Sequence, residues 1–555
     1  MTVAPSVPDQ SVTDLAPSQR WLEVRWETLA MAASLAAAAI IRVVAVFQYR
    51  IDSDEPQHLH MVWTWASGLL PYRDVFDNHM PLFHMLLAPL LRMVGERADA
   101  LIAMRLAMLP LYAAMIAITF RIASRCYPRR VAIWGAIVAA LFPLLVLCSV
   151  EFRTDDLWAV FWLASIAILV SAPLTTSRVA ASGFLLGLAA AVSAKTMLLL
   201  LSVAVGAMCV AIKTGRLRAG RYTAAFLAAG VIPPAAIAIY FAARGAWDPF
   251  VYGVITHNMV HHVRVLRLIL FPVLLFLIAM LARRAADTPQ RYFLFVTTHF
   301  YGAALYCLWP LVEHEHWLPY FPLAAITLVS LFFTYRRVVI IAFAEIVIVL
   351  AIGRLHRNET RDGLTVIEQT LQLTTPGEFV MDLKGETVFR PRAFYYVLEP
   401  MTKHRMFKGV IADTVVSDIL RTRTMVIGPD LYGYSRATRK FLQKNFAFIG
   451  GVRVPGRILP AGESTFQIDV PAEYAIVGRR DAFAGALDGT PYDGARPLAA
   501  GFHTISPAPA GESYALLWAR AAERGFTPFG VIRKRPAVHH HHPKGAHCNP
   551  GCRRT

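Results

Sequence analysis

Apolar residues in the first 350 positions form long runs that short polar segments separate. Several runs approach the roughly 20 residues that a helix needs to cross a bilayer, and they lack the alternating polarity of a membrane barrel. We predict about eleven spans, at about 29–49, 99–123, 131–149, 157–173, 179–193, 197–212, 223–243, 266–282, 292–311, 317–334 and 338–353. The pattern therefore predicts a polytopic α-helical membrane protein with a transmembrane domain at 29–353.

Composition supports this class of protein. Hydrophobic residues make up 56% of the 555 positions and charged residues 17%, too few for the surface of a soluble chain of this length. The net charge of +18 does not indicate a nucleic-acid partner, because basic residues of membrane proteins accumulate in cytoplasmic loops. Residues 1–28 are polar and the first apolar run is long enough to span, so we expect a disordered cytoplasmic N-terminus without a cleavable signal.

The loops between the predicted spans separate by the sign of their charge. Basic loops are "RCYPRR" (125–130), "KTGRLRAGR" (213–221), "RRAADTPQR" (283–291) and "YRR" (335–337). Acidic loops are "DSDE" (52–55), "EFRTDD" (151–156) and "EHEH" (313–316). With the N-terminus inside, all basic loops are cytoplasmic and all acidic loops lie outside, which predicts a bacterial cytoplasmic (inner) membrane protein with this orientation.

The first outer loop, 50–98, carries two short apolar segments. Residues 80–94 and 55–68 are below spanning length, and a span at 80–94 would invert the charge pattern of all later loops. We therefore expect 80–94 to form an interfacial or re-entrant helix on the outer face, and 55–68 to lie at the interface.

Polarity rises after residue 353, which predicts an extracytoplasmic region. Residues 354–464 mix helical stretches with short strands such as "EFVMDL" and "TMVIG", as in a small α/β domain. Residues 465–535 read as a β-sandwich-like domain, and the histidine-rich tail 536–555 is expected to be disordered. Residues 355–535 contain no cysteine, so this region has no disulfide framework.

Charged residues gather in the acidic loops in a pattern that suggests one site. The carboxylates are Asp54, Glu55, Asp155 and Asp156, and the interleaved cations are His79, Arg153, Lys195 and His316. Structural alternatives remain for each group: an Asp before a helix is a common cap, and a lone Lys195 either reaches the lipid headgroups or meets an anion. Glu313 and His314 could also bind a divalent metal.

The first outer loop resembles that of the membrane glycosyltransferases of the GT-C class, in the branch with protein O-mannosyltransferases and the lipid A aminoarabinose transferase. The resemblance lies in "DSDEPQHLHMVWTWASGLLPYRDVFDNHMPLFHMLLAPLLRMVGE" (52–96), with "RTDDLW" (153–158), "GFLLGLAAAVSAKT" (183–196) and "HWLPYFPLAAI" (316–326) in the same order. It covers about residues 29–335. It implies transfer of a sugar from a polyprenyl-phosphate donor to a glycan, lipid or protein hydroxyl at the outer face.

The resemblance also implies roles for individual residues. Asp54 matches the base-like aspartate, Asp155 the second-loop acidic position with Asp156 as its competitor, and Lys195 the lysine near the donor phosphate. His79 and His316 stand where relatives have Lys and Arg, so their charge depends on pH. A carboxylate can take the acceptor proton, and cations can stabilise the leaving phosphate. We predict an inverting transferase with an Asp base.

Two other classes of function remain open from the sequence. A transporter or flippase of a lipid-linked sugar would need functional charges within the spans and access to both faces. A non-catalytic subunit of an envelope-assembly complex would need none of the acidic loops for chemistry. The one-sided acidic loops favour the enzyme over the transporter.

Overall fold

The computed structural model describes residues 17–171, 173–215, 220–259, 265–510 and 514–529. The chain divides into two compact units, with the division between Arg439 and Lys440. The predicted disordered tail and residues 1–16 lie outside the described residues. Residues 17–28 are helical rather than disordered, since helix α2 begins at Pro17, and proline is favoured in the first turn of a helix.

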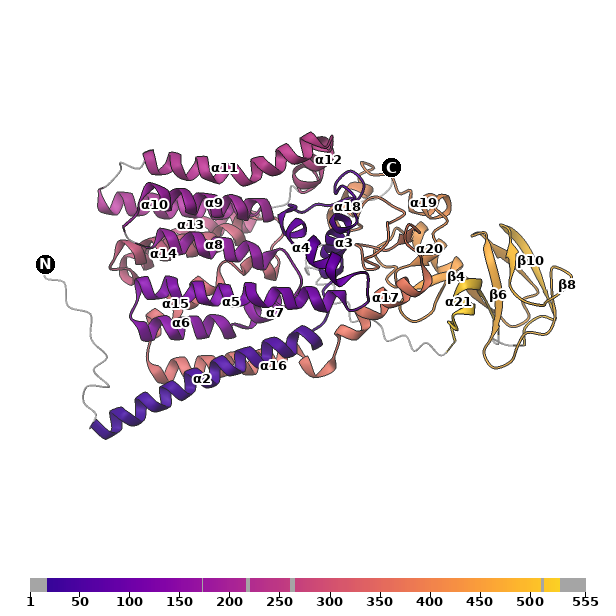
Figure 1. Cartoon of the computed structure of the whole chain (residues 1–555), viewed down its shortest axis with the longest axis horizontal. Coiled ribbons are helices and arrows are strands. Elements are labelled where there is room, and N and C mark those ends of the chain that lie inside the picture. The colour runs from indigo at the N-terminus through magenta and orange to yellow at the C-terminus, as the bar shows by residue number, and fades with distance from the viewer. Residues whose placement is uncertain (1–16, 172, 216–219, 260–264, 511–513, 530–555) are drawn as a thin grey trace. The chain divides into compact units, whose positions relative to one another are not determined.

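Helices of different lengths run side by side through most of the N-terminal unit (Figure 1). They are α2 (Pro17–Gln48), α5 (Ala100–Cys126), α6 (Arg129–Leu141), α7 (Pro143–Cys148), α8 (Asp155–Leu169), α9 (Thr176–Val192), α10 (Thr196–Thr214), α11 (Gly220–Ala243), α13 (Val265–Ala285), α14 (Pro289–Leu308), α15 (Phe321–Phe332) and α16 (Tyr335–Gly353). Each predicted span overlaps one of these helices, except the span at 131–149, which is divided between α6 and α7 at Phe142.

Length and apolar composition identify the chain as a multi-pass membrane protein. Within the described residues, six segments are long and apolar enough to cross a membrane, namely Arg25–Gln48, Ala100–Cys126, Thr196–Thr214, Gly220–Ala243, Val265–Arg284 and Tyr335–Leu373. Three shorter apolar helices are Leu82–Val94, Thr176–Val192 and Phe321–Phe332. The predicted class, a polytopic helical membrane protein, is confirmed, while the total of eleven crossings stays a prediction.

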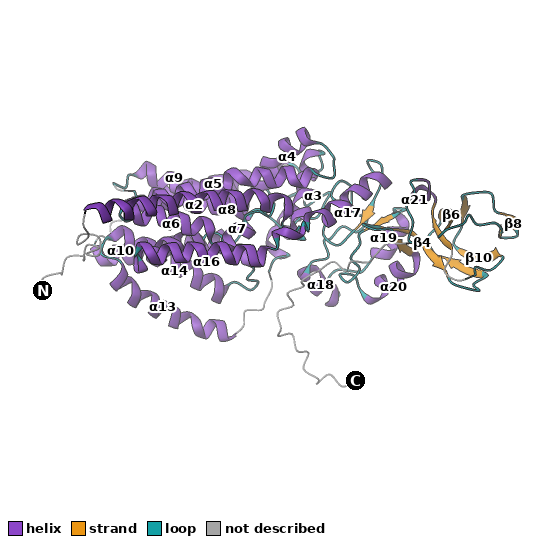
Figure 2. Cartoon of the chain, turned by 90° about the horizontal axis from the view of Figure 1, so that it is seen from below, coloured by secondary structure: helices purple, strands orange, loops and turns teal. Residues whose placement is uncertain are grey.

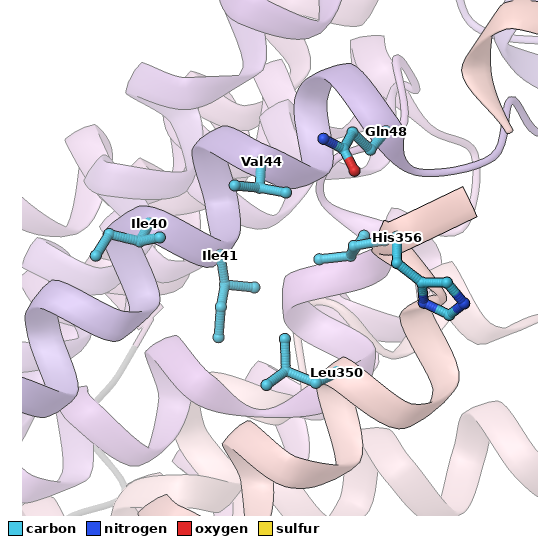
Figure 3. Close-up of a pocket in the computed structure, with 7 residues that line it drawn as sticks. Ile40, Ile41, Val44, Gln48, Leu350 and His356 are labelled. Carbon is cyan, nitrogen blue, oxygen red and sulfur yellow. The ribbon is translucent and has the colours of Figure 1, made fainter. Parts of the chain in front are cut away.

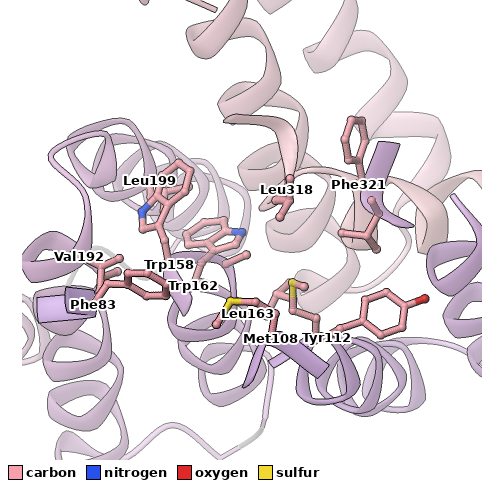
Figure 4. Packing of buried hydrophobic residues seen from close by; sticks show 14 of the residues in the cluster. Phe83, Met108, Tyr112, Trp158, Trp162, Leu163, Val192, Leu199, Leu318 and Phe321 are labelled. Carbon is pink, nitrogen blue, oxygen red and sulfur yellow. The ribbon is translucent and has the colours of Figure 1, made fainter. Parts of the chain in front are cut away.

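Tight helix contacts hold the bundle together. A Cβ atom at Gly183 would lie 2.1 Å from the Phe226 carbonyl oxygen, and one at Gly187 would lie 2.3 Å from that of Gly230. This Gly-xxx-Gly face of α9 lets α11 approach closely, as small residues do between membrane helices. The buried rings of Trp158 and Trp162 on α8 fill the centre of the bundle (Figure 4).

The short outer-loop helices α3 (Asp54–Ala66) and α4 (Leu82–Val94) lie at one end of the bundle (Figure 1). Each has 13 residues, too few to cross a membrane, so the short lengths inferred from the sequence are confirmed. The two helices meet through His58 and His84, whose ring nitrogens lie 3.0 Å apart. Their interfacial position in a bilayer stays a prediction.

Residues 354–439 continue from the end of α16. They contain η3 (Leu355–Arg357), α17 (Thr360–Leu373), β1 (Val380–Met381), α18 (Pro400–Phe407), α19 (Val415–Arg421) and β2 (Val426–Ile427), and β1 pairs with β2 in parallel. Backbone and side-chain bonds fix the start of α17 against the end of α2: Glu359 N–H donates to the Gln48 carbonyl, and Thr360 Oγ1 donates to that of Tyr49.

The C-terminal unit is built mainly of antiparallel strands, drawn in orange in Figure 2. After α20 (Arg436–Asn445), which ends inside it, come β3 (Phe446–Phe448), β4 (Arg453–Leu459), β5 (Thr465–Ile468), β6 (Ala472–Gly478), β7 (Ala486–Leu487), β8 (Thr490–Pro491), β9 (Arg496–Leu498), β10 (Gly501–Ser506), β11 (Tyr514–Trp518) and α21 (Ala519–Glu523). Strands β4, β11, β6 and β9 are neighbours in that order, β3 also pairs with β4, and β5, β10, β7 and β8 form the second sheet. The domain boundary proposed at 464/465 stays a prediction.

Candidate active site

The three acidic loops meet at the end of the bundle that carries α3 and α4. Asp54 begins α3, Asp155 begins α8, Lys195 immediately precedes α10, and Glu315 lies in the 3-10 helix η2 (His314–Trp317). These helix starts favour nearby carboxylates because the N-terminal end of a helix carries partial positive charge. Residues that are far apart in the sequence thus share one end of the bundle.

Asp54 is not the cap of its helix. The first N–H of α3 is bound by Asp52, whose Oδ1 accepts from Asp54 N at 3.1 Å. The Asp54 carboxylate points instead toward cations, with Oδ2 3.0 Å from Arg153 Nη2 and Oδ1 2.6 Å from Lys384 Nζ. The capping alternative therefore does not explain this carboxylate.

Arg153 is the centre of the charged network, which we call the Arg153 cluster. Its guanidinium is within 4 Å of five carboxylates, those of Asp52, Asp54, Glu151, Asp155 and Glu315. The shortest contact joins Nη2 to Glu315 Oε1 at 2.5 Å. The planar guanidinium has five N–H donors, so one Arg can hold several carboxylates in fixed positions.

Lys195 meets an anion rather than the lipid headgroups. Its Nζ lies 2.8 Å from Asp155 Oδ1 and 5.1 Å from the centre of the Trp158 ring. Its side chain is 15% exposed, so the ammonium group remains accessible from outside the cluster. Lys195 and Asp155 are thus joined to the Arg153 cluster as the sequence pattern anticipated.

The charges in the cluster shift the proton affinities of its members. Burial alone would raise the pKa of Asp54, but Lys384 and Arg153 together hold that pKa well below its usual range. Burial and the nearby Asp52 carboxylate raise the pKa of Glu151 well above its usual range. Burial, opposed by Arg153, raises the pKa of Glu315 to about 7. The cations thus favour the ionised form of Asp54, whereas burial favours the protonated form of Glu151.

The carboxylates next in sequence to Asp54 and Asp155 are placed differently. Glu55 is fully buried and accepts hydrogen bonds from Arg105, with Oε2 2.7 Å from Nε, and from the Phe152 N–H at 2.9 Å. Both oxygens of Asp156 are buried without a hydrogen-bond partner among the described residues. Glu55 accepts from the Asp52 N–H but pairs with Arg105, and within the described residues neither Glu55 nor Asp156, both predicted to be catalytic, forms an ion pair with Arg153.

The two predicted histidines have existing partners. His79 Nδ1 lies 2.9 Å from Asp77 Oδ1. His316 Nδ1 accepts a hydrogen bond from the Glu313 N–H, and burial together with the charge of Lys195 keeps the pKa of His316 well below its usual range. His316 is therefore neutral and does not supply the positive charge that the sequence pattern suggested.

Glu313, one of the two candidate metal ligands, serves a structural purpose. Glu313 caps η2, with its side chain accepting from the backbone of His316 in a reciprocal capping box. Within the described part of the chain, no group of three or more His, Cys, Asp or Glu side chains is arranged to hold a metal ion. Glu313 and His314 thus do not form a metal site with a third such residue.

Four members of the cluster were not among the predicted site residues, namely Asp52, Glu151, Glu315 and Lys384. Asp52, Glu151 and Glu315 were visible in the acidic loops, but the residues singled out in "EHEH" were Glu313, His314 and His316. Lys384 follows the membrane helices by many residues, and no local pattern links it to Asp54.

A separate hollow of about 240 Å³ lies between α2 and the end of α16 and is lined mainly by apolar side chains (Figure 3).

The bundle and its loops define the class of fold, which is GT-C-like. The structure is similar to that of ArnT from Cupriavidus metallidurans in the apo state, with a TM-score of 0.54 and 13% identity over 78% of this chain and 98% of that one. ArnT from the same organism bound to undecaprenyl phosphate has a TM-score of 0.54 and 12% identity, over 78% of this chain and 97% of that chain. The resemblance to GT-C membrane glycosyltransferases seen in the sequence is thus confirmed.

A more distant match is the Archaeoglobus fulgidus oligosaccharyltransferase tethered with an acceptor peptide. Its TM-score is 0.42, with 10% identity over 73% of this chain and 69% of that chain. No protein-family model matches the sequence, and no curated protein matches it significantly.

Proposed function

We propose that this protein is an inverting glycosyltransferase that moves a sugar from a polyprenyl-phosphate donor to an acceptor hydroxyl. The observation that carries the proposal is the Arg153 cluster itself. Asp54, Arg153, Asp155 and Lys195, from three separate loops, form one ion-pair network at one end of a GT-C-like bundle. The ArnT structure with undecaprenyl phosphate supports the donor class by analogy of fold.

The proposed reaction needs a base and a cationic site. The acceptor oxygen attacks the anomeric carbon, its proton passes to the Asp54 carboxylate, and the bond between that carbon and the phosphate oxygen breaks. The phosphate leaves with the bonding electron pair, and Lys195 stabilises its charge, with Arg153 fixing the carboxylates around it. A single displacement of this kind inverts the configuration of the anomeric carbon.

Asp155 and Glu55 take supporting roles in this proposal. Asp155 orients Lys195 through their 2.8 Å contact. Glu55, enclosed by Arg105, fixes α3 against α5 and is a structural ion pair rather than a catalytic group. The catalytic assignment at the start of α3 therefore rests on Asp54 alone.

We propose that the acidic end faces outward in a bacterial cytoplasmic membrane. The basic loops gather at the opposite end, where Arg291 donates to the Cys126 carbonyl and Lys213 to the Ala286 carbonyl. Positive loops remain on the cytoplasmic side, which supports a cytoplasmic N-terminus and an extracytoplasmic region after residue 353. A lipid-linked sugar and its acceptor would meet at the outer face.

The transporter alternative finds less support. It requires charges along the spans, but Arg42 and Arg105, the buried arginines of α2 and α5, bind groups near the acidic end. Arg42 Nη1 donates to Ser149 Oγ at 2.8 Å, and Arg105 pairs with Glu55.

The test is Asp54→Asn in sealed proteoliposomes supplied with a radiolabelled polyprenyl-phosphate sugar and extracted envelope acceptors. We expect transfer to fall by about 10²–10⁴-fold, the usual contribution of a general base. Asp99→Asn is the matched control, since Asp99 precedes α5 and pairs with Arg97 instead of the cluster. Unchanged transfer by Asp54→Asn would remove Asp54 as the base. Label crossing the bilayer without transfer would favour the transporter.

A further inference from the structure

Lys384 joins the cluster from a part of the chain outside the bundle. Its Nζ lies 2.6 Å from Asp54 Oδ1 and 3.2 Å from Ser53 Oγ, and its side chain is 21% exposed. The contact spans 330 positions of sequence. The resemblance to GT-C enzymes seen in the sequence covers about residues 29–335 and does not include this lysine.

The loop that carries Lys384 is firmly built. The buried Asp382 carboxylate accepts from Gly385 N–H at 2.8 Å, from Thr387 N–H at 2.9 Å and from Arg392 Nε at 2.8 Å. Several hydrogen bonds to one carboxylate fix the turn 382–387 in a single conformation. Lys384 is therefore presented at a defined place rather than on a loose strand.

The same loop is docked on the helix that Asp54 begins. The ring of His60 on α3 bonds through Nδ1 to the Val388 carbonyl at 2.5 Å. Gly385 has a φ of +112°, which strains any other residue, and a Cβ at this position would lie 3.0 Å from His60 Cβ, a tight contact that requires a small shift. Asp54 and Lys384 thus lie on two segments, α3 and the 382–388 loop. These segments also contact each other at His60, about two helical turns along α3 from Asp54.

The contact has a chemical consequence for a base. A carboxylate whose lone pairs are shared between Lys384 and Arg153 binds a proton weakly, because both cations favour its ionised form. A general base works best when its pKa lies close to the working pH. Asp54 in the substrate-free protein is therefore a poor base.

We propose that Lys384 is a ligand of the donor phosphate, and that its move from Asp54 to the phosphate converts Asp54 into the base. This inference rests on the proposed function and adds to it the residue that couples donor binding to catalysis. The Lys384 side chain is long and partly exposed, so its ammonium group can exchange one anion for another while the loop stays fixed. Acceptor deprotonation then begins only after the donor has bound.

The charges of the cluster suit this exchange. Among the ionised groups, the anions are Asp52, Asp54 and Asp155 and the cations are Arg50, Arg153, Lys195 and Lys384. Burial raises the pKa of Glu151 well above its usual range and that of Glu315 to about 7, which weakens the negative charge that these two groups oppose to the four cations. An incoming phosphate anion supplies the missing negative charge.

The step balances without any further reactant. The donor phosphate takes the Lys384 hydrogen bond, and Asp54 accepts the acceptor proton as the new carbon–oxygen bond forms. The phosphate leaves with the electrons of the old bond, still held by Lys384. Return of Lys384 to Asp54 after the phosphate departs releases the proton to water.

Lys384→Met tests the inference with two measurements on the full chain in nanodiscs. We expect the Kd for undecaprenyl phosphate to rise by about tenfold or more, the value of one charge-assisted hydrogen bond. We also expect the acidic side of the pH profile of kcat/KM for transfer to move to higher pH. This profile reports the pKa of the free enzyme's base. In the variant, Asp54 faces Arg153, Asp52 and His58 without Lys384. Lys384→Arg should restore both values in part.

Controls separate this inference from the proposed function. Lys408→Met removes an exposed lysine just after α18 and should change neither value. Gly385→Ala keeps the Lys384 side chain but displaces the loop that carries it, and should raise the Kd for undecaprenyl phosphate. An unchanged Kd or an unchanged acid limb in Lys384→Met overturns the inference, provided the wild type transfers sugar. A wild type that binds the phosphate lipid but transfers no sugar instead overturns the proposed function, and the Kd comparison still decides the role of Lys384.

Discussion

The two ends of the helical bundle are both rich in charge, but they use it differently. At the basic end, Arg291 and Lys213 bond to backbone carbonyls, and Arg291 also pairs with the exposed Asp287. At the acidic end, charged side chains bond mainly to each other, and Arg153 is 9% exposed. At the basic end the cations satisfy backbone carbonyls near helix ends. At the acidic end opposite charges are concentrated away from water.

This difference has an energetic meaning. Exposed ion pairs contribute about 0–1 kcal/mol because water and salt screen them. Removing one partner of a buried pair costs about 3–5 kcal/mol, since the remaining charge stays desolvated. A fold that keeps such a buried network has a functional reason for it more often than a stabilising one.

The largest effect is expected from Arg153→Met, which removes the cation between the carboxylates. We expect a loss of about 3–5 kcal/mol in the free energy of unfolding and no measurable sugar transfer. The unpaired carboxylates would then have raised pKa values in the folded protein, so the loss should be larger at pH 8 than at pH 5. Unfolding in detergent followed by tryptophan fluorescence measures it. A loss below 1 kcal/mol at both pH values would contradict the buried network.

A smaller effect, on pH dependence alone, is expected from Glu315→Gln. Glu315 faces Arg153, Asp155, Lys195 and His316, and its pKa is about 7. Below that pH Glu315 is mostly neutral, and above it the negative charge of its carboxylate repels the donor phosphate. The KM for the donor should therefore rise several-fold between pH 6 and pH 8 in the wild type, by about the value of one charge pair. The variant should show a flat profile, and an equal rise in both proteins would exclude Glu315 as the titrating group.

The smallest effect is expected at the basic end. Arg291→Met removes the 2.6 Å bond to the Cys126 carbonyl and an exposed i,i+4 pair with Asp287. We expect less than about 1 kcal/mol in the free energy of unfolding and unchanged transfer. Activity lost without a loss of stability would mean that the basic end takes part in the reaction, and the contrast between the ends would no longer hold.

The sequence predicted the helical class well because membrane spans depend on composition over about 20 residues and not on fine packing. Loop charge also predicted which segments meet, since Asp54, Asp155 and Lys195 do gather at one end. What could not be predicted was the direction of each carboxylate. Successive residues on a helix point about 100° apart, so Asp54 and Glu55 face different partners although they are neighbours.

The amino-acid sequence by itself determined that the chain crosses a membrane repeatedly and that its acidic loops share a side. Both follow from local composition, which each segment carries independently of the others. The tertiary structure alone decided that Arg153 joins five carboxylates, that Asp156 turns away from them, and that Lys384 reaches Asp54. These contacts depend on how distant segments pack, and no pattern within one segment encodes the position of another.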